Sequence, residues 1–280
     1  MNKHSVLFLF ISLLFTFCKE KETVSPLDST QQAIVNELNV VSQPIAGSDI
    51  SLPVTDLAPL DGFADAKIIG LGEATHGTKD FFEMKNRIFK YMVEQHGFKA
   101  IAFEMDVAEA MIFEDLIQGK TSGDMRFIMI SKMYFWTWKT QEVLELLVWM
   151  RDYNVGKSPA DRIHFYGVDC QTVKYNGDAL LTLLATVDAA FADEIKSQLQ
   201  GYLSLNDAGD TTNNTILKQK LADVAQQISN HHDNLIANGL SVTDFEMAKH
   251  LARVIIQTQA LNYFLLDWIN SIQVLHWLIG

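Results

Sequence analysis

Residues 66–169 contain three short apolar segments, and the order of these segments limits the folds that the chain can adopt. They are AKIIGLG at 66–72, FKAIAFE at 98–104 and RIHFYGVD at 162–169, and each has the length and the apolar composition of a buried strand. Longer segments with helical periodicity separate them. Strands that alternate with helices in this way predict an α/β fold, in which a mostly parallel sheet is flanked by helices.

The segments between the predicted strands contain clear helical signals. Residues 79–97 and 107–119 repeat apolar side chains at helical spacing, and each segment ends at a glycine. Residues 140–154 form a third such segment, for which Thr140 is the expected N-cap. From about residue 176 onward nearly all of the sequence has a helical pattern, so we expect a large helical portion in the C-terminal half.

The first 18 residues resemble an export signal. A short basic region precedes an apolar run over residues 6–17, and Cys18 follows that run directly. The sequence FTFC resembles a bacterial lipobox, in which this cysteine would be lipidated and become the first mature residue. Because the apolar run is short for a membrane span, we expect cleavage, export and a lipid anchor in the cell envelope. An uncleaved anchor and a signal peptide without lipid are the alternatives.

The sequence predicts three parts. Residues 1–18 are the leader, residues 19–60 are a polar tether with one short amphipathic helix, and residues 61–280 are the α/β domain. The last segment ends within an apolar, tryptophan-rich pattern that has no helix stop signal. On this ground we expect the α/β domain to be incomplete at its C-terminus.

Polar side chains gather where the three predicted strands end. Glu73 and His76 follow the first strand, Glu104 ends the second, and Asp169 ends the third. In open α/β sheets, functional groups collect at the carboxyl ends of the strands, where the loops leave the sheet. A single acid in this position can simply cap the following helix. Three neighbouring strands that deliver such groups predict a shared site.

Lys85 is the unusual residue of the predicted helix at 79–97. It projects from the apolar arc of that helix, whereas Arg87 falls on the opposite, polar face. An unpaired ammonium in apolar surroundings is costly, so Lys85 must either extend to water or pair with an acid. Glu73 and Glu104 are the expected partners, because both are predicted at the same end of the sheet.

Several chemistries are disfavoured because the sequence lacks the motifs that they need. Glu73 and His76 form a single Glu-x-x-His pair, whereas carboxylate-bridged di-iron sites need two copies on helices. His-Glu-x-x-His, a paired cysteine cluster, a Gly-x-Ser-x-Gly elbow and a dinucleotide fingerprint are absent. The formal net charge of −12 argues against nucleic-acid binding. Metal-free acid–base chemistry remains, in which His76 takes a proton from water, a carboxylate orients its ring and Lys85 stabilises an oxyanion.

Segments from three regions of the sequence resemble the erythromycin esterase-like family. They are residues 68–104, with GEATH after the first strand, FWTWKTQEVLELLVWMRDYN at 135–154 and HFYGVDCQ at 164–171. The resemblance covers roughly residues 60–260. It implies an α/β core with a helical portion beside the cleft. It also implies hydrolysis of a small-molecule ester or macrolide lactone by a water that a histidine activates, without metal or other cofactor.

Carried over to this chain, the base is His76, and Glu73 and Glu104 are the acids of the cleft. Family members have a further histidine in a later segment, and the surroundings of His276 do not match that segment. The resemblance therefore leaves the catalytic competence of this chain open.

Aromatic residues and one acid are the candidate substrate-binding groups. Trp136 and Trp138 belong to an aromatic cluster that either lines an apolar pocket or forms a core patch, and Asp169 is the third strand-end acid. Three functions stay open. The first is an exported ester hydrolase. The second is a catalytically impaired envelope protein that keeps the fold and a binding cleft. The third and weakest is a metal or haem binder that uses Glu73 and His76.

Overall fold

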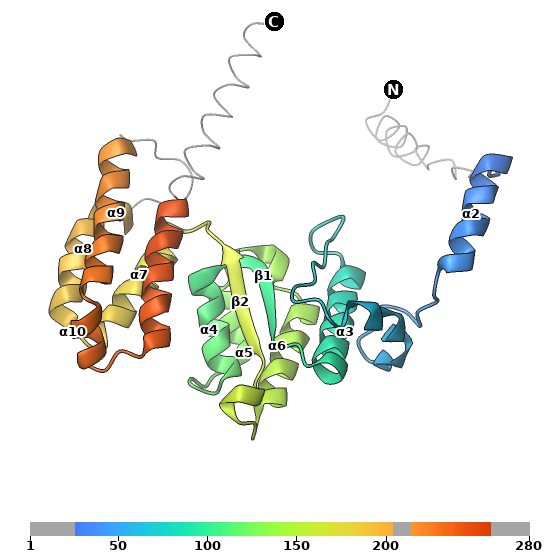
Figure 1. Ribbon diagram of the computed structural model, residues 1–280, viewed down its shortest axis with the longest axis horizontal. Helices are drawn as coiled ribbons and strands as arrows, with labels where there is room; N and C mark the ends of the chain where they lie inside the picture. The colour runs from blue at the N-terminus through green and yellow to red at the C-terminus, as the bar shows by residue number, and fades with distance from the viewer. Residues whose placement is uncertain (1–25, 204–213, 259–280) are drawn as a thin grey trace, which may run out of the picture. The chain divides into compact units, whose positions relative to one another are not determined.

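The computed structural model describes residues 26–203 and 214–258, so the predicted leader with Cys18 and the C-terminal segment lie outside the described residues (Figure 1). The chain divides into two units, Met1–Ile45 and Ala46–Gly280. Within the first unit, α2 (Ser29–Val41) begins at a capping box, in which the Asp28 carboxylate accepts hydrogen bonds from the main-chain N–H groups of Thr30 and Gln31. None of the α2 side chains is buried. In the described part of the chain, no helix has the length and apolar character needed to cross a bilayer.

The second unit has a mixed half followed by a helical half. The elements of the mixed half are η1 (Val54–Phe63), α3 (Lys79–His96), β1 (Ala100–Asp106), α4 (Val107–Ile117), α5 (Met125–Lys132), η2 (Trp136–Trp138), α6 (Gln141–Asn154), η3 (Pro159–Asp161) and β2 (His164–Asp169). Those of the helical half are α7 (Val173–Ala185), α8 (Ala189–Leu203), α9 (Asn214–Asn230), α10 (His232–Ala237) and a helix over residues 242–258. The predicted α/β class and the helical C-terminal half are confirmed.

The sheet pairs β1 with β2 in parallel, from Ala100 opposite His164 to Phe103 opposite Gly167. Helices α4 and α6 pack beside it, and the buried side chains of this half form one apolar core around Phe165. A second apolar core joins α7, α8, α9 and the helix over residues 242–258. The two described strands therefore lie at the centre of the mixed half, and the helical half has an apolar core of its own.

The predicted strand at 66–72 does not form. Residues 66–73 are irregular, Ile68 is 89% exposed, and none of residues 67–77 makes a main-chain hydrogen bond to another described residue. A strand needs a neighbouring strand to satisfy its N–H and C=O groups. Here a cavity separates the segment from β1, so the two cannot pair. The described part of the sheet accordingly has two strands rather than the three expected.

The polar face to which the sequence assigns Arg87 is covered by another segment. Arg87 is fully buried, and its guanidinium donates hydrogen bonds to the main-chain carbonyls of Gly47 and Pro53 and to the Asp56 carboxylate, which lies 2.5 Å away. Residues 46–63, which include η1, cover this side of α3. Arg87 therefore binds this segment to α3 instead of facing water.

Gly167 marks the closest approach of the two strands. A Cβ atom at this position would lie 2.5 Å from the carbonyl oxygen of Met105 and 2.6 Å from that of Asp106, beside the register shift between Phe103 and Asp106. Gly167→Ala should therefore lower the free energy of unfolding by about 1–3 kcal/mol, because the strands must separate to admit the methyl group. Urea unfolding measures this change.

Gly62→Ala is the matched control for that substitution. A Cβ at Gly62 has no atom within 4 Å, so its free energy of unfolding should change by less than about 1 kcal/mol, and in the stabilising direction. Equal effects at the two glycines would contradict the proposed close approach.

Candidate active site

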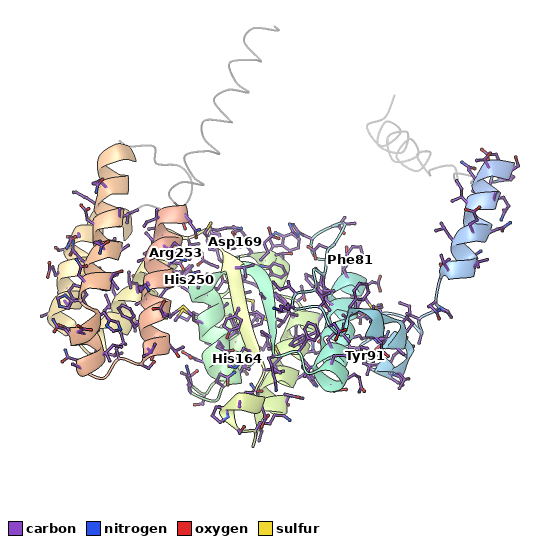
Figure 2. All side chains as sticks on the ribbon, in the orientation of Figure 1. Phe81, Tyr91, His164, Asp169, His250 and Arg253 are labelled. Carbon is purple, nitrogen blue, oxygen red and sulfur yellow. The ribbon has the colours of Figure 1, made fainter. Side chains whose placement is uncertain are left out.

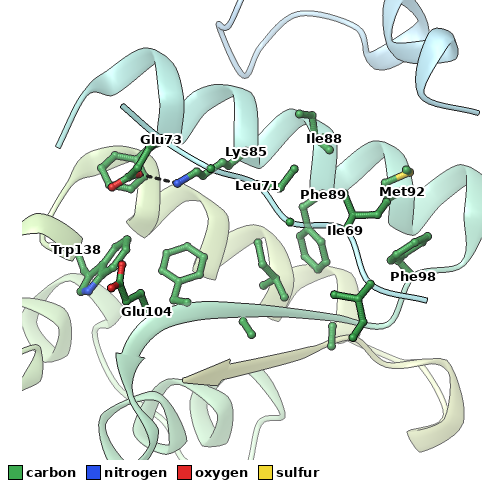
Figure 3. A pocket seen from close by; sticks show the side chains of 18 of the residues that line it. Ile69, Leu71, Glu73, Lys85, Ile88, Phe89, Met92, Phe98, Glu104 and Trp138 are labelled. Atoms are coloured by element: carbon green, nitrogen blue, oxygen red, sulfur yellow. Dashed lines mark hydrogen bonds and ion pairs between the residues drawn. The ribbon is translucent and has the colours of Figure 1, made fainter. Parts of the chain in front are cut away.

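A cavity of about 690 Å³ lies between the segment 67–73, α3 and β1 (Figure 3). Most of its wall is apolar, with side chains such as Leu71, Ile88 and Met92. Glu73, Lys85 and Glu104 gather at one end, where β1 finishes. The described residues thus place a polar site at the carboxyl end of a strand, as the sequence predicts, and an apolar trench behind it.

Glu73 contacts both His76 and Lys85. Its Oε1 lies 2.5 Å from His76 Nδ1, and its Oε2 accepts a hydrogen bond of 2.6 Å from Lys85 Nζ. The side chains of Glu73 and Lys85 are mostly buried, at 14% and 16% exposed, whereas that of His76 is 60% exposed. The predicted pairing of Lys85 with an acid is confirmed, and Glu73 is the partner.

The electrostatics keep Glu73 ionised. Burial alone would raise its pKa, but the hydrogen bonds from Lys85 and His76 outweigh burial, and the pKa of Glu73 is lowered. Because Glu73 occupies Nδ1 of His76, Nε2 is the nitrogen left without a partner among the described residues. The arrangement leaves an exposed imidazole nitrogen that is oriented from behind by a carboxylate.

Local conformation fixes where these groups sit. Gly77 has a φ of 76°, a left-handed conformation that turns the chain from the irregular segment into the start of α3 at Lys79. The ring of Trp136 would lie 3.0 Å from a Cβ atom at Gly77, so a side chain there would have to displace the ring slightly. The turn therefore places His76 next to Glu73. The exposed ring of Trp136 packs against the turn.

The predicted site residues do not all reach the cavity. Glu104 and Trp138 line it with Glu73, His76 and Lys85, and Glu104 makes no hydrogen bond or ion pair with another described residue. The ring of Trp138 packs against Phe103 and Phe82, with centroids 5.0 and 5.8 Å away.

The other two predicted substrate-binding residues lie outside the cavity wall. Trp136 is 70% exposed and rests on Gly77. Asp169 ends β2, opposite the His164 end, and accepts hydrogen bonds from its own neighbours, Cys170 N and Gln171 Nε2 (Figure 2). A role for these two in substrate binding stays a prediction.

Two buried carboxylates near the end of β1 are absent from the sequence prediction. Asp106 accepts hydrogen bonds from Thr172 N, Thr172 Oγ1 and Asn176 Nδ2 at 2.5–2.7 Å, and so ties β1 to the start of α7. Burial raises the pKa of Asp106 in spite of these bonds. An acid directly after an apolar strand, two residues beyond Glu104, is the sequence signal that could have identified it.

Glu109 is the second of these carboxylates. It is 1% exposed, its Oε1 accepts a hydrogen bond of 2.7 Å from Tyr134 N, and its Oε2 has no hydrogen-bond partner. Burial raises the pKa of Glu109 to about 7. This hydrogen bond holds the start of the loop that carries Trp136 and Trp138 against α4.

The described residues contain no group of three or more His, Cys, Asp or Glu side chains placed to hold a metal ion. Glu73 and His76 point at each other, and the nearest cation to the pair is Lys85. The described site is a carboxylate in contact with an imidazole and an ammonium.

A family model described as erythromycin esterase matches residues 93–270, which is more than half of the chain. The chain belongs to the erythromycin esterase family. The match includes Glu104 and Trp138 and begins after Glu73, His76 and Lys85, so the position of these three rests on the geometry given above.

Curated relatives are similar to part of this family member. Erythromycin esterase type II of Escherichia coli is 28% identical over 135 residues, which are 48% of this chain and 30% of the relative. The putative hydrolase YbfO of Bacillus subtilis (strain 168) is 30% identical over 111 residues, which are 39% of this chain and 23% of the relative. The chain thus matches less than a third of the length of these relatives.

Solved structures share the fold at low sequence identity. A protein from Bacillus cereus superposes with a TM-score of 0.70 at 23% identity, over 85% of this chain and 57% of that chain. A mutant of the erythromycin esterase EreC in its open conformation gives 0.58 at 16% identity, over 79% and 56%. These similarities support the α/β architecture of the family member.

Glu109 should make stability depend on pH. Its folded pKa of about 7 lies above that of an unfolded glutamate, which is about 4.3. Its contribution is therefore complete below about pH 4.3 and is lost as the pH rises through 7. Glu109→Gln keeps an oxygen for Tyr134 N–H and cannot ionise. The free energy of unfolding of the variant should rise relative to wild type by on the order of 2 kcal/mol between pH 5 and pH 7.5 and then level off. Urea unfolding across this range measures the difference, and a difference that does not vary with pH would contradict the assignment.

Proposed function

We propose that this erythromycin esterase family member is a metal-independent hydrolase of carboxylic esters or lactones, in which His76 is the general base. One observation carries the proposal: a single carboxylate, Glu73, binds both the imidazole of His76 and the ammonium of Lys85 at the polar end of the cavity. A base, a group that orients it and a cation for developing negative charge are the parts that ester hydrolysis needs.

The proposed reaction starts at Nε2 of His76. With Nδ1–H donating to Glu73, Nε2 carries the lone pair and takes a proton from a water molecule as the water oxygen attacks the ester carbonyl. Glu73 stabilises the imidazolium that forms. The carbonyl oxygen becomes an oxyanion, and Lys85 has N–H groups beyond the one donated to Glu73 that can stabilise it. The imidazolium then returns its proton to the leaving alcohol oxygen, and the products are a carboxylic acid and an alcohol.

The cavity wall favours a bulky apolar substrate. Apolar side chains from α3 and from the segment 67–73 surround it, with Trp138 next to Glu104 at the polar end. A macrocyclic lactone buries a large apolar surface and presents one ester carbonyl, which suits such a cavity. We propose Glu104 as the second acid of the cleft, with Trp138 as a substrate-contacting wall.

His76→Ala should reduce kcat/KM for ester hydrolysis by about 10²- to 10⁴-fold, because it removes the base and leaves the cavity in place. The purified chain is assayed with p-nitrophenyl esters by absorbance and with erythromycin by the mass increase of one water. His232→Ala in α10 is the matched control, since His232 does not line the cavity, and its activity should equal that of wild type.

The same assay separates the competing functions. Activity that survives His76→Ala would rule out His76 as the base. Binding of the macrolide without turnover in wild type would favour a catalytically impaired binding protein. Loss of activity with a chelator and its recovery with added metal would instead favour a metal site.

We also propose that the protein is exported and anchored in the cell envelope by a lipid on Cys18. The support is the sequence: a short basic region, an apolar run of leader length and a cysteine directly after it. A single lipid chain anchors weakly, so stable attachment would need the several acyl chains of a bacterial lipoprotein.

Cys18→Ser should abolish incorporation of radiolabelled palmitate and move the protein out of the membrane fraction, because the serine hydroxyl is not a substrate for thioether formation. Cys170→Ser is the control, since it removes the other cysteine of the chain and should keep the label. Label that persists in the Cys18 variant, or wild type without label, would contradict the proposal.

A further inference from the structure

Several buried polar atoms of the described residues have no hydrogen-bond partner, and three of them belong to one contact. This contact joins α4 to residues 134–138, here called the aromatic segment. The three atoms are Oε2 of Glu109, Oγ1 of Thr137 and Nε1 of Trp138, and each is closed off from solvent. A buried donor or acceptor without a partner costs free energy that contact with water would recover. The contact is therefore a packed arrangement that gains hydrogen bonds when it opens.

Glu109 is the group in this contact that can change its charge. Its Oε1 accepts a hydrogen bond of 2.7 Å from Tyr134 N, and this bond offsets only part of the cost of burial, so the pKa of Glu109 is raised to about 7. Asp106, at the N-cap of α4, raises this pKa further, and Lys139, which follows η2, lowers it. Among the described residues, α6, α7 and the sheet also pack against α4 and add no further charge to this titration.

The aromatic segment, rather than α4, should move when Glu109 ionises. Helix α4 contributes buried side chains to both apolar cores, whereas the aromatic segment contains a single 3₁₀ turn, η2. An ionised Glu109 with one donor is a poorly compensated buried charge. A shift of the segment would admit water to its Oε2 and to the other two unpaired atoms.

The aromatic segment carries two side chains toward the proposed catalytic groups. Trp136 rests on Gly77, the residue after His76, and its side chain is largely exposed. Trp138 lines the cavity beside Glu104 (Figure 3). A shift of the segment would therefore alter the wall of the cavity at its polar end, while the hydrogen bonds of Glu73 stay in place.

We propose that Glu109 is a positioning residue for the proposed hydrolase: its neutral carboxyl holds the aromatic segment in the arrangement that binds substrate, and its ionisation releases the segment. The inference rests on the proposed function for its effect on substrate, but not for the movement itself. Glu109 lies outside the cavity wall and acts through Trp136 and Trp138. Its ionisation should therefore change KM, whereas the acid–base chemistry of His76 sets kcat.

Fluorine NMR of the full chain labelled with 5-fluorotryptophan tests the movement without substrate. His76→Gln is the background, because ionisation of the imidazole beside Gly77 would itself shift a nearby resonance. In this background the resonances of Trp136 and Trp138, assigned by Trp→Phe substitutions, should shift with a midpoint near pH 7. Adding Glu109→Gln should abolish both transitions and keep the resonances at their low-pH positions, because glutamine retains an acceptor oxygen and cannot ionise.

Hydrolysis of a p-nitrophenyl ester tests the effect on substrate. The neutral fraction of Glu109 falls about tenfold between pH 6 and pH 8, so KM of the wild type should rise about tenfold over this range. Glu109→Gln should keep the low-pH KM at both pH values, with the pH dependence of kcat unchanged. Glu109→Ala removes the acceptor for Tyr134 N–H and should have a raised KM at both pH values.

Three results would overturn the proposal. They are the absence of a transition near pH 7 in the His76→Gln background, a transition that survives Glu109→Gln, and a wild-type KM that does not change between pH 6 and pH 8. Failure of the proposed function is a separate result. If the wild type does not hydrolyse the ester, the hydrolase proposal fails, and the NMR transition still decides whether Glu109 holds the aromatic segment.

Discussion

The edge of β1 that has no strand partner among the described residues is the constraint on which the rest of the described structure depends. Backbone N–H and C=O groups must find partners, and β1 satisfies one row of them through β2. Its other row faces an apolar cavity, and residues 67–73 line the far side without pairing. This gap is the reason why the first predicted strand is irregular. It also sets the shape of the cavity, and it places the polar end of the cavity where β1 finishes.

The contrast between helices and strands explains how much of this fold the sequence could predict. Signals for α3 and α6 are local: α3 ends at Gly97, and the Thr140 hydroxyl accepts a hydrogen bond from Val143 N at the start of α6. The apolar run at 66–72 has an equally clear strand composition. A strand exists only with a neighbour, however, and the neighbour is a non-local fact that composition does not contain. The same segment can therefore be predicted as a strand and yet lie unpaired.

The site was partly predictable for a related reason. Lys85 stood out because a cation on an apolar helical arc needs an acid, and that acid is Glu73. The burial of Arg87 could not be predicted, because a helical repeat shows which residues share a face and not what covers that face; residues 46–63 cover it. Glu109 gave no signal, since an acid in the first turn of a helix is ordinary, and its burial and its hydrogen bond from Tyr134 N are visible only in the folded chain.

Helix α3 fixes the position of the site, although the segment that carries Glu73 is irregular. It is held on one side by Arg87, which binds the segment that contains η1, and on another by Asn86, whose amide donates to the Glu142 carbonyl of α6. Lys85 directly precedes these two anchors in α3, so its position is set by the packing of the helix. The partner Glu73 belongs to a segment with no main-chain bonds to other described residues, which the Lys85–Glu73 ion pair and the packing of Ile69 hold in place. An ion pair with both side chains mostly buried is strong only while both partners stay in place. The position of His76 therefore depends on Glu73, that of Glu73 depends on Lys85, and that of Lys85 depends on the packing of α3.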